Sequence, residues 1–421
     1  MTDHIRYRLT ITTLTPLHVG SGQRLREGFD FVTHAGSLWI ADQGKLYDAM
    51  LDEATRRPTP RAEPPGSMAA ALLRAGLALQ PAAEAPEDLM QFAAGLAGKT
   101  MSYFVANKWL RDEHFDLSKG LFRYAVKGTM ATTQQEGELH EQIKDVFARA
   151  YLPGSSLKGA LRSMVLRRLA ADDSRAPIAS GSPKFAARDM EARHFVSENA
   201  PRGAAPNYDL WRALHVSDSS PIAPDVLAVA QIHVHRPGGA RQTGQGDAIP
   251  ITVEAIPSGV ETQATAAVDD WLFTDARAAK LGFARERMAL FTGDLCGMAN
   301  HDAMQRIQAE LEFYRTAGFT FDTGNVSARL KQIAEIAEHA DAGEMVIQTG
   351  RSTGWLSKTL GSVLLTRMAA EDFNALVANY NLGRGRWRQD RPLPATRQLV
   401  SMPGEINVPM GWLRIRMEEE R

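Results

Sequence analysis

Apolar and polar residues alternate along residues 5–14, near the start of the chain. Ile5, Tyr7, Leu9 and Ile11 recur with period two, which is typical of a strand with one buried face. The segment ends in "TPLHVGSGQ", residues 15–23, which is rich in turn-forming residues. The alternation therefore predicts a fold that contains a half-buried sheet.

Strand and helix patterns follow one another in both halves of the chain. "FDFV" and "SLWI" flank "THAG" and predict a hairpin, and further strands are predicted at "ALHVSDS", "VLAVAQIHVHR", "AIPITVEAIP", "TQATAAV", "EMVIQTG" and "GWLRIRME". Helical spacing is found in residues 151–170, 277–316, 325–340 and 368–380. The mixture predicts an α+β fold.

The length of 421 residues favours two domains, which we place at residues 1–260 and 261–421. The proline-rich "ATRRPTPRAEPPG" introduces a segment rich in Ala, Leu and Met, so we expect a mostly helical insertion at about residues 55–148. Residues 172–206 are polar and rich in Pro, Ala and Ser, which predicts a long surface loop.

Charge and cysteine content narrow the classes of protein that fit. The formal net charge is −1, so no global basic field indicates nucleic acid, and any such site must be local. The single cysteine, Cys296, excludes a disulfide framework and a cysteine-rich zinc site. The N-terminus does not read as a signal sequence, and no uncharged apolar run is long enough to span a bilayer. We expect a soluble cytoplasmic protein that does not contact membranes.

The segment "PGSSLKGALR" leads a proline-glycine turn into a helix. Ser155 or Ser156 is the predicted N-cap, and exposed amides at the positive end of the helix dipole favour an anion there. Residues 151–170 carry four basic side chains and no acid, namely Lys158, Arg162, Arg167 and Arg168. On these residues alone, a capped helix with a solvated basic face is as good an interpretation as an anion site.

Two glycine loops and an arginine-rich segment offer further local sites. "TPLHVGSGQ" permits close approach of a sugar-phosphate chain, and "TGRSTGWLSKTLG", residues 349–361, combines glycines with Arg351, Trp355 and Lys358. Trp355 fits a stacked base or a core anchor equally well. "GRGRWRQDRPLPATR" contains Arg384, Arg386, Arg388, Arg391 and Arg397. This cluster fits a local basic site for nucleic acid or a flexible solvated loop.

Catalytic signatures are few. His18 fits a general base, although a hydrogen-bonded loop histidine is the commoner case, and Asp30 fits a group acting on a phosphodiester. His233 and His235 share one face of a predicted strand without a nearby third ligand, and Asp218 fits an Asx turn. No acid/base pair, metal cluster or nucleophile elbow appears in the sequence, so we expect no catalytic residue, metal or cofactor.

The order of these motifs resembles the RAMP proteins of CRISPR–Cas systems. "TPLHVGSGQ" after a first strand, "YLPGSSLKGALR" after an insertion, "HVSDS" and a late "TGRSTGWLSKT" carry the resemblance, which runs from about residue 7 to residue 416. Within that superfamily the length, the insertion and the ending "VPMGWLRIRMEE" look most like the fifth-subunit family of type III-A Csm effector complexes.

This resemblance implies two RRM-like, ferredoxin-like domains in a non-catalytic subunit. Such a subunit caps the backbone filament, holds the 3′ part of a CRISPR RNA (crRNA) and supports crRNA maturation. Its partners would be crRNA, the other Csm subunits and especially the backbone RAMP subunit, with target RNA and a trimming nuclease as further candidates. The residues implied to face RNA are Gly154, Ser155, Ser156, Lys158 and Arg162, then His18, Gly20, Ser21 and Gly22, and finally Arg351, Ser352, Thr353 and Lys358.

Two departures keep alternatives open. The aromatic pattern of RNA-stacking RRM sheets is absent from the predicted strands, which favours capture of the RNA backbone over base stacking on the sheet. Asp30 stands in a place broadly similar to the loop aspartate with which neighbouring backbone subunits cut RNA. An endoribonuclease acting on crRNA precursor or target RNA, through Asp30 or His18, therefore remains an alternative. A RAMP subunit of a type III-B complex is another.

Overall fold

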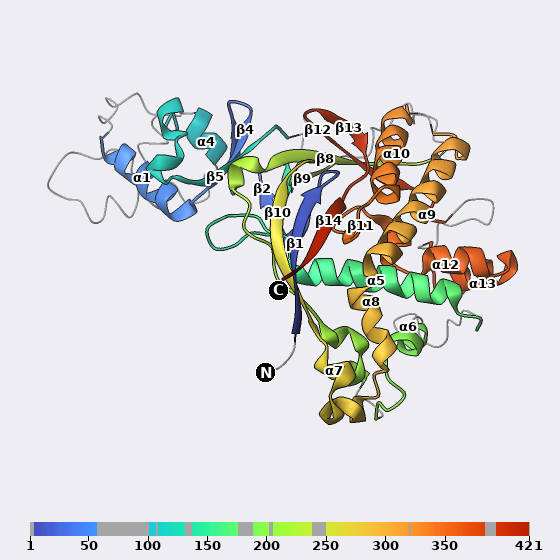
Figure 1. Cartoon of the computed structure of the whole chain (residues 1–421). Helices are drawn as coiled ribbons and strands as arrows, with labels where there is room; N and C mark the ends of the chain where they lie inside the picture. Colours follow the sequence, from blue (N-terminus) through green and yellow to red (C-terminus); the bar gives the residue numbers. More distant parts are fainter. Residues whose placement is uncertain are drawn as a thin grey trace. The chain divides into compact units, whose positions relative to one another are not determined.

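The computed structural model describes residues 4–56, 101–106, 108–130, 137–175, 188–201, 205–237, 250–319, 321–383 and 393–420 (Figure 1). By their internal contacts these residues form two compact units, a larger one within residues 1–22 and 141–421 and a smaller one within residues 23–140. Strands β2 (Gly20–Arg26) and β6 (Glu138–Gln142) carry the chain between the two units.

A five-stranded antiparallel sheet is central to the larger unit. Its order is β11-β14-β1-β10-β7, formed by Glu344–Gln348, Trp412–Glu420, His4–Thr13, Glu261–Asp269 and Leu214–Val216. In the register, Leu9 of β1 lies opposite Ala264 on one side and Met417 on the other. Leu9 and Ile11 are buried, so the predicted alternation of β1 is confirmed.

Three long helices accompany this sheet in the larger unit. They are α5 (Gly154–Asp172), α9 (Leu295–Thr316) and α10 (Gly324–Glu338). Helix α5 packs against α9 and β7, and α9 packs against α10 and β11. The chain order β1, α5, β7, β10, α9, β14 with the strand order β14-β1-β10-β7 is a βαββαβ arrangement of the RRM-like kind. The predicted α+β class is confirmed.

A second group of strands in the larger unit surrounds β8 (Ala228–His235). Strand β8 pairs with β9 (Ile251–Ala255) and with β12 (Arg397–Met402), and β12 also pairs with β13 (Glu405–Val408). Ala230, Ile232, Val253 and Val400 form part of its core. Strands β8 and β9 were predicted, whereas the hairpin of β12 and β13 lies beyond the predicted elements.

The smaller unit is built on the antiparallel strands β3 (Phe31–His34), β4 (Ser37–Ala41) and β5 (Phe122–Lys127). Helices α1 (Gln43–Arg56) and α4 (Met101–Ala106) complete it. Its core includes Met50, Phe104, Trp109 and Phe122. The hairpin of β3 and β4 confirms the prediction.

The segment expected to be mostly helical is less helical than predicted over its described residues. Residues 122–127 and 138–142 form β5 and β6, because Phe122, Tyr124 and Val126 alternate with polar or small residues and bury one face. Residues 57–100, where most of the helical spacing falls, lie outside the described residues.

The remaining helices are short. They are α6 (Arg188–Phe195), α7 (Trp271–Thr274), α8 (Ala289–Thr292), α11 (Gly354–Lys358), α12 (Gly361–Arg367) and α13 (Ala370–Asn379), with 3-10 helices at Asp112–His114, Leu117–Lys119, Ala205–Tyr208, Leu210–Ala213, Pro224–Val226, Ala276–Leu281 and Arg285–Met288. The long surface loop predicted for residues 172–206 is wrong at residues 188–195, because these residues form helix α6. The helix is held by buried Phe195, which packs edge-on against Trp211.

The predicted domain boundary at residue 260 stays a prediction. Strand β10 begins at Glu261 and pairs directly with β1, so one sheet of the larger unit contains strands from both sides of that position.

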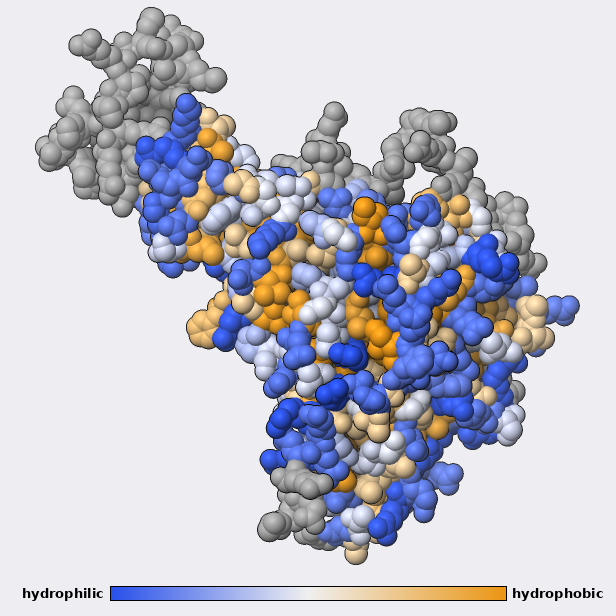
Figure 2. Space-filling model, turned by 45° about the horizontal axis from the view of Figure 1, so that its top comes forward, coloured by the Kyte–Doolittle hydropathy of each residue, from blue (hydrophilic) through white to orange (hydrophobic). Residues whose placement is uncertain are grey.

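On the face seen in Figure 2, hydrophilic residues predominate and hydrophobic ones gather in a few patches. None of the described helices is both long and apolar enough to cross a membrane.

Candidate functional site

Three segments far apart in the sequence line one pocket of about 450 Å³ in the larger unit. They are the turn after β1, the first turns of α5 and the glycine loop after β11. The described lining residues are His18, Val19, Gly20, Ser156, Gly159, Ala160, Ser163, Gln348, Thr349, Gly350, Arg351, Thr353, Ser357 and Lys358. We call this the three-segment pocket. It brings together the three motifs that the sequence singled out separately.

Hydrogen bonds join the three segments that line this pocket. The Arg351 N–H donates to the His18 carbonyl oxygen over 2.8 Å, and the Thr349 hydroxyl donates to the Ser156 carbonyl oxygen over 3.2 Å. Gly350 has a φ of 88°, and a Cβ there would lie 2.7 Å from the His18 oxygen. Only glycine fits this close approach without strain.

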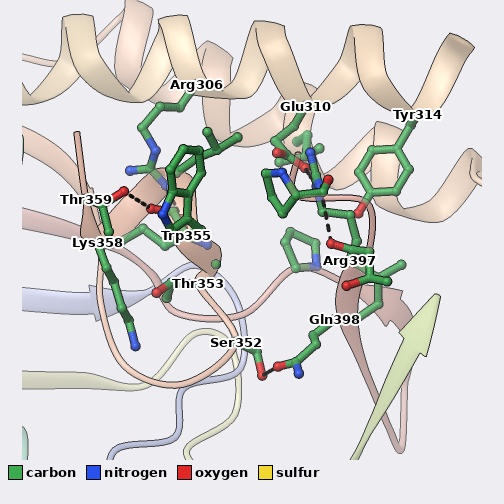
Figure 3. Close-up of a pocket in the computed structure, with 18 of the residues that line it drawn as sticks. Arg306, Glu310, Tyr314, Ser352, Thr353, Trp355, Lys358, Thr359, Arg397 and Gln398 are labelled. Atoms are coloured by element: carbon green, nitrogen blue, oxygen red, sulfur yellow. Dashed lines mark hydrogen bonds and ion pairs between the residues drawn. The ribbon is translucent and has the colours of Figure 1, made fainter. Parts of the chain in front are cut away.

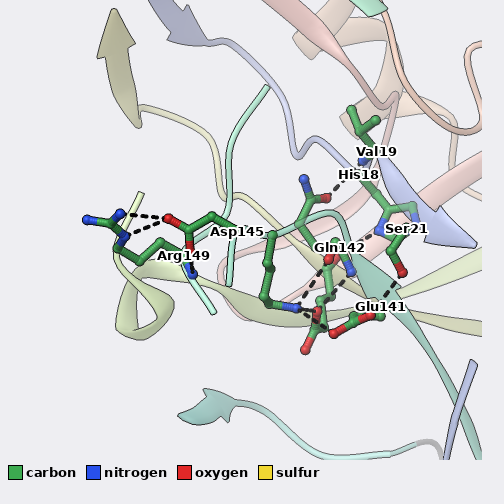
Figure 4. A network of polar contacts seen from close by, with 9 residues as sticks. His18, Val19, Ser21, Glu141, Gln142, Asp145 and Arg149 are labelled. Carbon is green, nitrogen blue, oxygen red and sulfur yellow. Dashed lines mark hydrogen bonds and ion pairs between the residues drawn. The ribbon is translucent and has the colours of Figure 1, made fainter. Parts of the chain in front are cut away.

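The loop around His18 rests on a polar network that is buried at His18, Gln142 and Glu254 (Figure 4). His18 is buried, and its Nδ1 lies 2.7 Å from the carbonyl oxygen of Glu254. The Val19 N–H donates to Gln142 Oε1 over 2.8 Å, and the Ser21 hydroxyl donates to Glu141 Oε2 over 2.9 Å. The loop is thus held at several points.

At the base of this network is a buried ion pair between Lys144 and Glu254. The Glu254 side chain is fully buried and also accepts a hydrogen bond from the Gln142 N–H over 2.8 Å. An ion pair this deep is costly to break, because the buried Lys144 side chain would then be left with the more distant carboxylate of Glu141, 3.7 Å away. Sequence reasoning missed it. An acid between Val253 and Ala255 in an apolar strand was the available signal.

The start of α5 differs from its predicted capping. Pro153 is the N-cap, the helix begins at Gly154, and neither Ser155 nor Ser156 caps it. Asp218 takes this role, since its Oδ1 accepts from the Gly154 N–H over 2.8 Å. A Cβ on Gly154 would lie 2.2 Å from the Val216 carbonyl oxygen, so only glycine fits at the first position of α5, where the end of β7 approaches. The chain's own carboxylate therefore occupies the predicted anion position.

The basic side chains of α5 are engaged within the protein. Lys158 Nζ donates to the Leu214 carbonyl oxygen over 2.6 Å, and burial lowers the pKa of this lysine. Arg162 holds Asp209 through two hydrogen bonds of 2.9 and 2.8 Å. Arg167 is buried and holds Asp302 through two of 2.7 Å. The solvated basic face is therefore wrong for these three residues, and RNA contacts of Lys158 and Arg162 stay predictions.

The glycine loop presents its cations to the three-segment pocket. Arg351 and Lys358 both line it, and no Asp or Glu is found among its described lining residues. Partial burial, and then the positive charge of Arg351, lower the pKa of Lys358. Two cations and several hydroxyls, with no acid among the described lining residues, form a site that favours an anion such as a phosphate.

The other predicted contact residues fall outside this pocket. Ser21 and Gly22 follow the lining part of their loop, and Gly154 is buried against β7. Ser155 is exposed at the start of α5. Ser352 donates to Gln398 Oε1 over 2.8 Å and lines a neighbouring pocket.

The arginine-rich segment is only partly described. Arg384, Arg386, Arg388 and Arg391 lie outside the described residues. Arg397 is described, and its Nε donates to Glu310 Oε2 over 2.6 Å. This arginine therefore takes part in internal packing.

The alternative catalytic residues are also placed. Asp30 closes a turn, accepting from the Arg26 N–H over 2.7 Å and from Gln43 over 3.0 Å. His233 and His235 lie side by side, with ring centroids 6.3 Å apart, and His235 packs on Phe321. Within the described part of the chain, no group of three or more His, Cys, Asp or Glu side chains could hold a metal ion.

Comparison with known proteins identifies the class. The RAMP superfamily model matches residues 10–295, and the chain belongs to this superfamily. Among curated relatives, the CRISPR system Cms protein Csm5 of Streptococcus thermophilus is 20% identical over 285 residues, 64% of this chain and 66% of that protein. The protein of the same name from Mycobacterium tuberculosis is 27% identical over 142 residues, 31% of this chain and 36% of that protein. The matches thus span less than two thirds of these relatives.

Solved structures show the same fold. One chain of a cryo-EM structure of a Csm–crRNA–target RNA ternary complex from a type III-A CRISPR-Cas system has a TM-score of 0.60 at 22% identity, covering 99% of this chain and all of that one. The crystal structure of T. onnurineus Csm5 has a TM-score of 0.58 at 20% identity, covering 96% of this chain and 99% of that one.

Proposed function

We propose that the protein is a non-catalytic, RNA-binding subunit of a type III-A CRISPR (Csm) effector complex. It caps the backbone filament at the 3′ end of the crRNA and supports crRNA maturation. The observation that carries this proposal is the three-segment pocket, where three motifs of a RAMP protein meet around two cations with no acid among the described lining residues. The Csm5 relatives and the fold of the Csm structures support the choice of complex.

The pocket favours an RNA backbone for electrostatic reasons. A phosphate would be attracted by Arg351 and Lys358, while hydroxyls of Ser156, Ser163 and Thr353 line the same space. Because the chain is otherwise close to neutral, only a few phosphates would be bound this way. We therefore expect weak binding of RNA by the isolated chain and tighter binding in the complex, where neighbouring subunits hold the same RNA.

The test is co-expression of the tagged chain with the other subunits of its complex and a CRISPR array. A ladder of crRNA lengths together with RAMP partners is expected to co-purify. The substitution Lys358→Glu should shift the crRNA 3′ length or reduce the RNA content. The matched control is Lys280→Glu, which reverses an exposed lysine outside the pocket and should change neither.

Unchanged crRNA content and length in Lys358→Glu would contradict the proposal. Partners characteristic of a type III-B complex would assign the chain to that complex instead. Cleavage of crRNA precursor or target RNA by the purified chain, lost in Asp30→Ala or His18→Ala, would establish the endoribonuclease alternative.

A further inference from the structure

A second pocket of about 670 Å³ adjoins the three-segment pocket and shares Gln348, Thr353 and Lys358 with it (Figure 3). It lies between α9, the glycine loop with α11, and the residues around β12. Its volume falls in the range of about 300 to 1,000 Å³ that small ligands occupy in proteins. We call it the Trp355 pocket.

The charges inside the Trp355 pocket are neutralised by the protein itself. Arg306 lies 3.5 Å from Asp302 and also donates to Gln348, while burial lowers the pKa of Arg306 to about 10. Arg397 is bonded to Glu310 over 2.6 Å and to the Pro394 carbonyl oxygen over 2.8 Å. The interior therefore favours a neutral polar group over a phosphate.

Lys358 is the exception among the cations that line this pocket. No carboxylate of the described residues forms an ion pair with it, and its pKa is lowered by partial burial and by Arg351. Figure 3 shows its side chain extending away from the Trp355 ring. The end of the pocket at Lys358, which is shared with the three-segment pocket, therefore favours a negatively charged ligand group. The part beside Trp355 favours a neutral one.

The Trp355 side chain is held in place, and the residue is half-buried and lines the pocket. It packs directly on Gly361, where an added Cβ would lie 2.2 Å from the ring. The Thr359 hydroxyl donates to the Trp355 carbonyl oxygen over 2.7 Å and accepts from the Gly361 N–H over 3.0 Å, which fixes the turn between α11 and α12. An indole that lines a pocket in a fixed orientation is a suitable stacking surface.

A polar edge lies across the same pocket. Ser352, with a φ of 63°, donates its hydroxyl to Gln398 Oε1 over 2.8 Å. This bond orients the Gln398 amide, and its NH2 group has no partner among the described residues. An oriented amide donor suits the carbonyl or ring-nitrogen acceptors on the edge of a base.

We propose that the Trp355 pocket accepts one unstacked base of an RNA strand whose adjacent phosphate lies at Lys358 in the three-segment pocket. The base stacks on Trp355, and its edge accepts a hydrogen bond from Gln398. This inference rests on the proposed RNA-binding function and deepens it, because it assigns base recognition to a loop pocket beside the backbone site.

The test uses the full chain, a labelled single-stranded oligoribonucleotide and a series of the same strand with one abasic position moved along it. Trp355→Ala should weaken binding about tenfold, with the salt dependence unchanged, because stacking is lost and no phosphate contact is removed. Trp355→Phe should restore most of the affinity. In the unchanged protein, one abasic position should cause the same loss, and in Trp355→Ala that position should cost nothing further.

The outcomes separate this inference from the function on which it rests. If the unchanged chain binds no RNA, both fail. If it binds RNA and Trp355→Ala binds equally well, or all abasic positions are equivalent in the unchanged protein, only the base pocket is wrong. A second arm replaces the oligoribonucleotide by adenosine or uridine monophosphate, and Trp355-dependent binding as tight as that of the strand would assign the pocket to free nucleotides and overturn the RNA assignment. The strand-side abasic series remains decisive even if Trp355→Ala disturbs folding.

Discussion

Helix α5 and the glycine loop after β11 both carry cations beside glycines and small polar residues, yet they use them differently. On α5, Lys158, Arg162 and Arg167 are bonded to the chain's own carbonyl and carboxylate groups. On the glycine loop, the Lys358 ammonium group forms no hydrogen bond or ion pair with the described residues, and it lines a pocket without acids among its described lining residues. The charge of a basic motif therefore does not show whether its side chains are available to bind RNA. Their contacts within the protein decide this. The observed contacts of the α5 cations are therefore structural, their RNA contacts stay a prediction, and RNA contact by the glycine loop is the part of this contrast that we propose.

The largest expected effect is on stability, through Asp302. Asp302→Ala should lower the free energy of unfolding by about 3–5 kcal/mol, because Arg167 and Arg306 would remain buried without their carboxylate. Urea unfolding measures the change. Asp172→Ala is the control, since Asp172 is largely exposed beside Arg168, and it should cost less than about 1 kcal/mol. Equal losses in the two variants would contradict a structural role for the end of α5.

The second effect concerns the loop that supplies His18. Glu254→Gln should cost about 1–3 kcal/mol, because Lys144 loses its nearer carboxylate partner and keeps the more distant Glu141, and the network beneath the loop is weakened. Glu138→Gln, at an exposed ion pair with Arg24, should change stability little. Thermal unfolding compares the two variants, and a Glu254→Gln protein as stable as Glu138→Gln would show that the network does not hold the loop.

A smaller loss of stability is expected for Arg162→Ala. The two hydrogen bonds to Asp209 and the contact of the guanidinium with the Phe195 ring are partly buried, so we expect a loss of about 1–2 kcal/mol. Lys358→Ala should leave unfolding nearly unchanged, because no internal bond of its ammonium group is found within the described residues. The comparison between α5 and the loop fails if the ranking of the two variants is reversed.

The smallest effect is a pH dependence next to the end of α5. Burial lowers the pKa of His194 below its ordinary value of 6.5, against the opposing charge of Asp173, the C-cap of α5. Below pH 6.5 the unfolded chain therefore binds a proton that the folded chain does not, and the free energy of unfolding should fall as the pH falls. Unfolding of His194→Gln between pH 7.5 and pH 5.5 should depend less on pH than that of the unchanged protein. An identical dependence would exclude His194 as the cause.

Local patterns were sufficient to predict the strands of the central sheet, because burial of one face imposes an alternation that the sequence shows directly. The segments of His18, Ser156 and Lys358 were predicted to share a function because their motifs resemble those of a known family. Their positions along the chain gave no such indication, and the structure brings them to one pocket. The partners of the cations could not be predicted. Arg167 and Asp302 lie 135 residues apart in sequence, and no local pattern links them. The Asp218 contact with the start of α5 was missed for the same reason.

The salt dependence of RNA binding tests the central claim most directly. A single-stranded oligoribonucleotide is titrated against the full chain over a range of salt concentrations, for the unchanged protein, Lys358→Gln and Arg162→Gln. We predict that Lys358→Gln reduces the slope of log K against log salt by about 0.7, the value for one phosphate contact on a single strand, and that Arg162→Gln leaves the slope unchanged. A reduced slope in Arg162→Gln together with an unchanged slope in Lys358→Gln would contradict the assignment of RNA binding to the glycine loop.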